Sequence, residues 1–147
     1  MSFNLAVISA RARAAHWTTP VAVFDGGQLT YRQLDQVSDR VAANLVAARI
    51  EPGDRVALQL PNIPQFLISY FGILKAGAVV VPLNVLLRAP RIAYHLEDSG
   101  ALVLITWEGV LAEAGQGCRG RRVPVLASSA IWLALLLIPP GVGGCLR

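Results

Sequence analysis

Lysine, cysteine and charged residues are all scarce in this sequence, and their scarcity excludes several classes of protein. Lysine occurs once, at Lys75, so nearly all the positive charge is arginine. Charged residues make up 15% of the 147 residues against 54% hydrophobic residues, with a mean hydropathy of +0.53, which excludes a disordered chain. The two cysteines, Cys118 and Cys145, are too few for a disulfide framework, so a reduced, cytoplasmic protein is expected.

Groups of metal-ligating or nucleic-acid-binding residues are also lacking. His16 lies far from His95, and His95 with Glu97 does not have the i, i+4 spacing of a helical zinc site. The net charge of +4 is dispersed and has no aromatic platform beside it, so no nucleic-acid partner is predicted. Residues 1–17 lack the order of an export signal and predict an amphipathic first helix.

Turn residues and capping spacing predict a β-hairpin followed by a long helix. Residues 25–27 (Asp-Gly-Gly) separate two β-prone runs at 21–24 and 29–31. Thr30 and Gln33 have the spacing of a capping box, and a helix is expected from there to about Arg49. The face predicted to be buried carries Leu34, Val37, Val41, Leu45 and Ala48, and the face predicted to be in solvent carries Arg32, Asp35, Asp39 and Arg40.

Apolar strands then alternate with helices. After a strand at 55–61, a helix is expected with Pro64 in its first turn, Asn62 and Gln65 at capping spacing, and Gly77 at its end. Gly72 within it is interpreted as a close approach to a neighbouring strand. The side chains of this helix predicted to be core are Phe66, Tyr70, Ile73 and Leu74.

The alternation predicts an open parallel sheet. A strand at 78–83 without polar alternation is typical of a strand covered on both faces. A helix from about Pro90 to Gly100 and a buried strand at 101–106 follow, and 123–128 is compatible with one more strand. The predicted fold class is α/β: an N-terminal helix and β-hairpin followed by an incomplete parallel βαβαβ layer. The turns lack G-x-G-x-x-G, which argues against a dinucleotide-binding oxidoreductase.

Three stretches resemble, in order and spacing, the amino-terminal part of AMP-forming acyl-CoA synthetases: "LTYRQLDQVSDRVAANL", "GDRVALQLPNIPQFLISYFGILKAGAVVVPLN" and "IAYHLEDSGA". Within that adenylate-forming superfamily the sequence is most similar to the fatty-acid–CoA ligases, over about residues 5–106 and more weakly to Ala127. The resemblance implies a parent reaction in which a fatty acid and ATP form an acyl-adenylate and coenzyme A then displaces AMP. It implies ATP, magnesium and coenzyme A for the parent family.

The resemblance carries no catalytic, cofactor-binding or metal-binding residue onto this chain. The family's phosphate-binding loop with its lysine, its acidic metal-associated residue and its carboxy-terminal lysine lie downstream of the matched part. Lys75 is instead interpreted as a residue of the last turn of a helix, where its positive charge interacts favourably with the helix dipole. Arg91 stands where family members often have glutamate, which predicts a less secure helix start.

The composition changes after Glu113, which is the last acidic residue, and 123–146 carries no charge. Residues 1–127 are therefore expected to form a partial AMP-binding-type domain, and 128–147 an apolar tail outside the family, with a shifted reading frame as one explanation. The expected function is that of a truncated amino-terminal piece of a fatty-acid–CoA ligase that is inactive alone. Acyl chain length and oligomeric state stay undetermined.

Two other functions are alternatives to this expectation, a membrane-anchored protein and a non-catalytic binding module. Arg119, Arg121 and Arg122 precede the uncharged tail in the manner of a membrane anchor, but the apolar run 131–138 is far shorter than the roughly 20 residues that span a bilayer. A non-catalytic binding module is the other alternative. Glu97 with Asp98 is interpreted as a solvated helix end rather than an acid–base pair, and Ser128 and Ser129 lack a nucleophile elbow.

Overall fold

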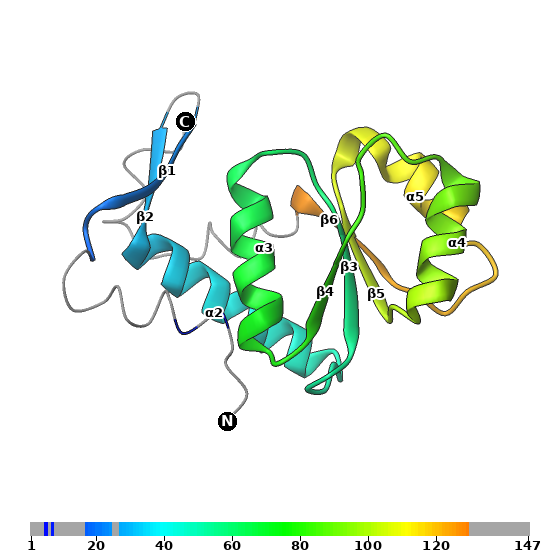
Figure 1. The fold of residues 1–147 in the computed structure, drawn as a ribbon, viewed down its shortest axis with the longest axis horizontal. Helices are drawn as coiled ribbons and strands as arrows, with labels where there is room; N and C mark the ends of the chain where they lie inside the picture. Colours follow the sequence, from blue (N-terminus) through cyan, green and yellow to red (C-terminus); the bar gives the residue numbers. More distant parts are fainter. Residues whose placement is uncertain (1–4, 6, 8–16, 25–26, 130–147) are drawn as a thin grey trace.

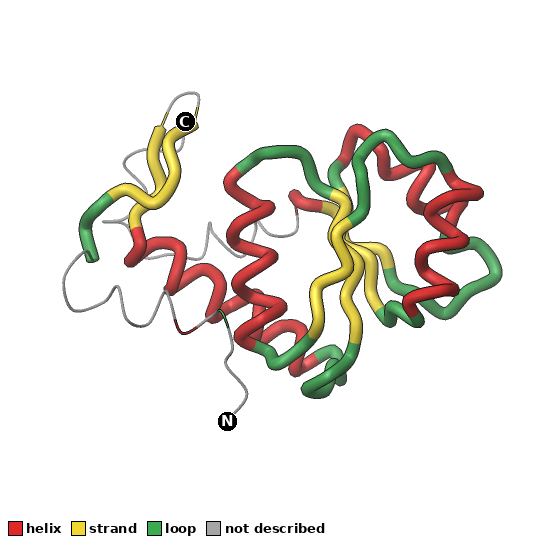
Figure 2. Tube along the Cα trace, viewed as in Figure 1, coloured by secondary structure: helices red, strands yellow, loops and turns green. Residues whose placement is uncertain are grey.

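The computed structural model describes Leu5, Val7 and residues 17–24 and 27–129. A two-stranded hairpin precedes a four-stranded sheet that has helices on both faces (Figure 1). In Figure 2 the strands of this sheet form a central layer between the helices. The first helix, predicted within residues 1–17, lies almost entirely outside the described residues.

The hairpin and the start of the long helix are confirmed. Strands β1 (Pro20–Phe24) and β2 (Gly27–Thr30) pair antiparallel, and α2 (Tyr31–Ala47) follows directly. The Thr30 hydroxyl oxygen accepts a hydrogen bond from the Gln33 amide at 3.2 Å, and Gln33 Oε1 accepts one from the Thr30 amide at 2.8 Å. This reciprocal pair is the predicted capping box.

Helix α2 ends slightly earlier than predicted, and its last turn has an unusual residue. Ala48 is the C-cap and is exposed, so the prediction that it belongs to the buried face is wrong. Arg49 follows with φ 67°, and among the described residues it is the non-glycine residue with a positive φ. The Ile50 amide donates to the Leu45 carbonyl at 3.0 Å, which is the closing bond of a Schellman motif.

The solvent face predicted for α2 is wrong at Asp35. Leu34, Val37, Val41 and Leu45 are buried as predicted, but Asp35 is only 4% exposed. Its carboxylate accepts a hydrogen bond from Lys75 Nζ at 2.7 Å, and its carbonyl oxygen accepts another at 2.8 Å. The helical period places Asp35 beside the buried stripe, and the neighbouring helix supplies a cation there.

The parallel βαβαβ layer is confirmed and is extended by one strand. Strands β3 (Arg55–Gln59), β4 (Val79–Pro82), β5 (Val103–Thr106) and β6 (Val125–Ala127) lie in the order β4-β3-β5-β6, and every neighbouring pair is parallel. Strand β5 is buried throughout. Strand β6 corresponds to the further strand considered at 123–128.

Full coverage of the strand at 78–83 is not observed. Strand β4 lies at the edge of the sheet, and Val79 is 46% exposed. An edge position also suits Pro82, which cannot donate a ladder hydrogen bond. Absence of polar alternation therefore did not distinguish an edge strand from a central one.

Helix α3 (Pro64–Lys75) has Pro64 in its first turn and ends before Gly77, as predicted, but it is capped differently. With Pro64 as its first residue, the N-cap is Ile63, which has no side-chain acceptor, so the capping pair predicted for Asn62 and Gln65 is wrong. Gln65 is instead buried, and its Oε1 has no partner within the described part of the chain. Gly77, with φ 78°, follows the helix as predicted.

Two predictions for the buried face of α3 need correction. Of the expected core stripe, Ile73 is fully buried, while Phe66, Tyr70 and Leu74 are half-buried. Gly72 makes its close approach to helix α2 and not to a strand. A Cβ atom on Gly72 would lie 2.6 Å from Val41 Cγ1, so glycine is required by the distance between the two helices.

The opposite face of the sheet is covered by α4 (Ala89–Ser99) and α5 (Leu111–Gly117), which follows the short 3-10 helix η1 (Glu108–Val110). Gly100 ends α4, as predicted, and the structure shows it in the left-handed conformation. The start of α4 does not depend on its own first turn, because the Ala89 amide donates to Glu113 Oε2 of α5 at 2.8 Å. This carboxylate brings a negative charge to the start of α4, whose own first turn contains Arg91 and no acidic residue.

The core consists of two apolar clusters, one on each face of the sheet. Along β3 the alternation is strict: Val56 and Leu58 pack towards α2 and α3, and Ala57 packs towards α4 and α5. None of the helices in the described ranges combines the length and the apolar character needed to cross a membrane.

Candidate functional site

Polar side chains gather where the parallel strands end, which is the edge at which open α/β sheets bind ligands. Gln59 ends β3, Thr106 ends β5, and both are fully buried. Thr106 Oγ1 donates to Gln59 Oε1 at 3.3 Å, and Gln59 Nε2 donates to the carbonyl oxygen of Asn84, after β4, at 3.2 Å. These bonds join the carboxyl ends of three strands.

Glu108 extends the same edge to the fourth strand. It follows β5 and begins η1, and its carboxylate accepts a hydrogen bond from Ser128 Oγ at 2.5 Å and another from the Ser129 amide. Both serines follow β6 directly, and the backbone at 128–129 is helical. The bond from Ser128 is the main cause that lowers the pKa of the Glu108 carboxyl below its ordinary value.

This edge is arranged for positioning rather than for chemistry. Gln59 and Thr106 are neutral, and their donor and acceptor groups are used within the protein. The Glu108 carboxylate is exposed and engaged by the two serines, so its lowered pKa suits a structural anion and not a general base near neutral pH. The bonds fix the places from which the loops after β3, β4, β5 and β6 leave the sheet.

Residues 17–24 and 27–129 contain no group of three or more His, Cys, Asp or Glu side chains that could hold a metal ion. His95 contacts the ring of Tyr94 edge-on at 5.5 Å between ring centroids. Glu97 and Asp98 are exposed at the end of α4, and Glu97 pairs with Arg121 at 2.7 Å, which agrees with a solvated helix end.

The residues that join the carboxyl edge were missed in the sequence. The sequence pattern places Gln59 and Thr106 in strands without indicating a role for their side chains, and it presents Ser128 and Ser129 only as candidate nucleophiles. The usable signal was that each is a polar residue at the end of an apolar run, because the ends of parallel strands share one edge. Lys75 was assigned to the last turn of α3, and its contact with Asp35 was not anticipated.

Solved structures share this arrangement of hairpin, helices and parallel sheet. The N-terminal domain of FACL13 from Mycobacterium tuberculosis has a TM-score of 0.82 and 28% identity, over 92% of this chain and 36% of that domain. A benzoate CoA ligase from Burkholderia xenovorans has a TM-score of 0.81 over 86% of this chain and 26% of its own, and at 24% identity it shows the fold alone. The fold is thus that of the N-terminal domains of adenylate-forming enzymes.

Residues 9–133 match the family model described as "AMP-binding enzyme", and the chain belongs to this family. Long-chain-fatty-acid–CoA ligase FadD13 of Mycobacterium tuberculosis is 44% identical over 78 residues, which is 53% of this chain and 16% of the ligase. Feruloyl-CoA synthase of an Amycolatopsis species is 46% identical over 95 residues, which is 65% of this chain and 19% of the synthase. The chain therefore spans less than a fifth of the length of these relatives.

Proposed function

We propose that this chain provides the amino-terminal scaffold of an ATP-dependent fatty-acid–CoA ligase. The observation that carries the proposal is the 44% identity over 78 residues with a relative named as a long-chain-fatty-acid–CoA ligase. The parent reaction is formation of an acyl-adenylate from a fatty acid and ATP, followed by transfer of the acyl group to coenzyme A. The similarity of the fold to the N-terminal domains of adenylate-forming enzymes supports this proposal.

The scaffold's role is to hold the carboxyl edge of the sheet. The hydrogen bonds from Thr106 to Gln59, from Gln59 to Asn84 and from Ser128 to Glu108 fix the points at which four loops leave the sheet. An adenylating site needs its reacting groups held in a fixed geometry, and fixed loop positions supply this. The described residues do not fit ATP with magnesium, because they include neither a metal-binding group nor a glycine-rich loop with a lysine. No step of the reaction is assigned to them.

It follows from the proposal that these 147 residues alone do not form an adenylate. The cation and backbone amides that stabilise a transferring phosphoryl group must come from residues outside this sequence. We further propose that the AMP-binding-type domain ends close to Ala127, with Ser128 still anchored to it through Glu108, and that the protein is cytoplasmic. Translation of the other two reading frames beyond Ala127 tests the boundary, because a phosphate-loop signature there would support a shifted frame.

A chimera tests whether the scaffold is that of a ligase. Residues 1–127 replace the matched amino-terminal part of FadD13, and ATP–pyrophosphate exchange is measured with a panel of fatty acids. Exchange that depends on a fatty acid is expected. A chimera with the circular dichroism and unfolding transition of a folded protein but without exchange would contradict the proposal.

A further inference from the structure

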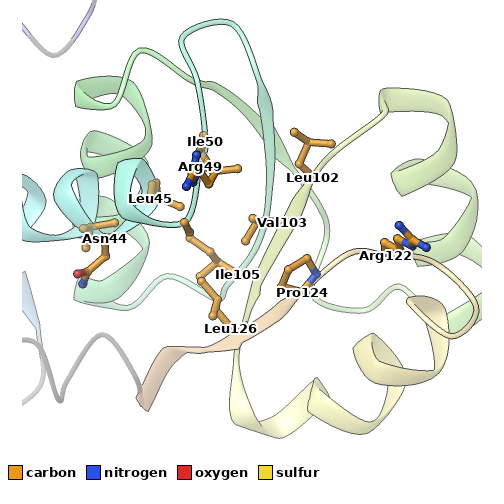
Figure 3. Close-up of a pocket in the computed structure, with 12 residues that line it drawn as sticks. Asn44, Leu45, Arg49, Ile50, Leu102, Val103, Ile105, Arg122, Pro124 and Leu126 are labelled. Carbon is orange, nitrogen blue, oxygen red and sulfur yellow. The ribbon is translucent and has the colours of Figure 1, made fainter.

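An apolar hollow of about 520 Å³ opens beside the end of α2, against strands β5 and β6 (Figure 3). Leu45 and Ile50, at the end of α2, and Val103 and Ile105 of β5 are its buried lining residues. All four belong to the apolar cluster on the α2 and α3 face of the sheet. The hollow therefore lies on that face, opposite α4 and α5.

Strand β6 is covered well on one face only. Val125 packs into the cluster of α4 and α5. Leu126 faces the other way, because side chains alternate along a strand, and it lines the hollow with 40% of its surface exposed. Leu102, directly before β5, lines the hollow as well and is 46% exposed. Among the described residues, the face of β6 opposite α5 is thus an open apolar surface.

The chain leaves β6 as the start of a helix. The backbone at 128–129 is helical, and the Glu108 carboxylate accepts hydrogen bonds from the Ser128 hydroxyl and the Ser129 amide. A carboxylate that accepts from a free amide stabilises a helix start. Residues 130–138 lie outside the described residues, and their sequence contains neither glycine nor proline. The sequence therefore allows this helix to continue to residue 138.

Composition and length match this segment to the hollow. Residues 131–138 (Ile-Trp-Leu-Ala-Leu-Leu-Leu-Ile) are apolar throughout, and a helix that is apolar on every side needs an apolar surface to cover it. As a helix the run is about 12 Å long, close to the roughly 13 Å of a four-residue strand such as β5. A helix that follows a strand packs back onto the sheet, so this one is directed towards the amino ends of β5 and β6.

The charges of the hollow favour this segment over a second copy of the chain. Arg49 and Arg122 are the charged residues of the lining, and they are exposed at its opposite ends (Figure 3). A symmetric dimer formed through this face would bring arginines of the two copies together, without an anion between them. Residues 130–146 carry no charge, so they can lie between the two arginines while both guanidinium groups stay in water.

We propose that residues 131–138 of this chain dock as a helix in the hollow and cover Leu102 and Leu126. The last segment of the chain is then a third helix on the α2 and α3 face of the sheet, held at its start by Glu108. The proposal goes beyond the proposed function, because it needs no adenylation by any part of the protein.

Fluorescence of Trp132 in the full chain tests the docking. With Trp17→Phe and Trp107→Phe, Trp132 is the one tryptophan left in the sequence. Docking should shift its emission to shorter wavelength than in the urea-unfolded chain and protect it from quenching by acrylamide. Circular dichroism and a cooperative unfolding transition establish that this chain is folded. Emission and quenching equal to those of the unfolded chain, in a folded protein, would overturn the proposal.

Substitutions in the hollow show whether it is the surface that protects Trp132. Leu126→Asn and Leu102→Asn should each move the emission to longer wavelength and increase quenching, because an amide in the hollow weakens its apolar contacts. Leu111→Asn is the matched control, since Leu111 is also 40% exposed and lies on α5, on the other face. Protection unchanged in both hollow variants would mean that Trp132 is buried elsewhere, and would overturn the proposal.

A disulfide tests the location directly. In a chain with Cys118→Ser and Cys145→Ser, the pair Leu102→Cys and Ile138→Cys should form a disulfide within one molecule on mild oxidation, because the docked helix ends near the amino end of β5. Leu111→Cys with Ile138→Cys should form far less. Non-reducing electrophoresis and sedimentation distinguish the products. Equal yields from the two pairs would contradict docking, and a disulfide only between molecules would mean that a second copy supplies the segment.

Discussion

The helices on the two faces of the sheet are joined by ion pairs that differ in burial. Between α2 and α3, Lys75 forms ion pairs with Asp35 and Asp39, and the side chains of Lys75 and Asp35 are only 13% and 6% exposed. On the other face, Arg88 pairs with Glu113 across side chains that are 78% and 29% exposed. Charge pairs of the same chemistry therefore differ in burial, and burial decides what removal of one partner costs.

The largest difference should come from Lys75→Met compared with Arg121→Met. Removal of Lys75 breaks its 2.7 Å ion pair with the buried Asp35 carboxylate, which costs about 3–5 kcal/mol of unfolding free energy. Removal of Arg121 breaks an exposed pair with Glu97, worth about 1 kcal/mol or less. Urea unfolding measures both. A loss below about 1 kcal/mol for Lys75→Met would show that the burial of the pair has no energetic consequence.

Helix packing gives the next contrast, between Gly72→Ala and Gly115→Ala. A Cβ at Gly72 would lie 2.6 Å from both Val41 Cβ and Cγ1, so α2 and α3 must move apart at a cost of about 1–3 kcal/mol. A Cβ at Gly115, in α5, meets no atom within 4 Å, so alanine should stabilise by about 0.5–1 kcal/mol. Thermal unfolding shifts of opposite sign are expected. Equal shifts would contradict the close approach of α2 to α3.

The next comparison concerns the start of α4, where the Glu113 carboxylate of α5 takes the place of an acidic residue in the first turn of α4. Glu113→Gln removes a negative charge from the helix N-terminus and should cost about 0.3–1 kcal/mol. Arg91→Glu should recover most of this loss in the Glu113→Gln background and stabilise less in the native background. A double-mutant cycle from urea unfolding gives the coupling. Strict additivity of the two changes would exclude the compensation.

The smallest effect concerns the bond between Glu108 and Ser128. Because the folded pKa of Glu108 is lowered, its contribution to stability is present above the unfolded value of about 4.3 and is lost as the pH falls through the folded pKa. Glu108→Gln should therefore differ most from the native chain at neutral pH, and the two should converge in acid. A difference independent of pH between 7 and 3 would argue against a titrating carboxylate.

Local signals predicted one part of the fold well. The capping box at Thr30, the hairpin pairing of residues 20–24 with 27–30 and the helix end at Gly100 each depend on a few adjacent residues, and all are confirmed. The parallel alternation of strands and helices was also predictable, because its apolar periods extend over many residues. These features require no knowledge of which elements are neighbours.

The errors arose where the outcome depends on a distant partner. Asp35 is buried because Lys75, forty residues away, meets it there. Gly72 is required by Val41 of another helix, and Val79 is exposed because β4 has a neighbour on one side only. The same holds for the candidate site, since the bond from Thr106 to Gln59 exists only once β5 lies beside β3.

ATP–pyrophosphate exchange by the purified chain of 147 residues tests most directly whether these residues are scaffold alone. With magnesium and a panel of fatty acids, exchange no greater than that of a protein-free blank is expected, because no described residue is suited to phosphate or metal. Exchange that increases with fatty-acid concentration would show that this chain carries adenylating groups of its own, and would contradict the account.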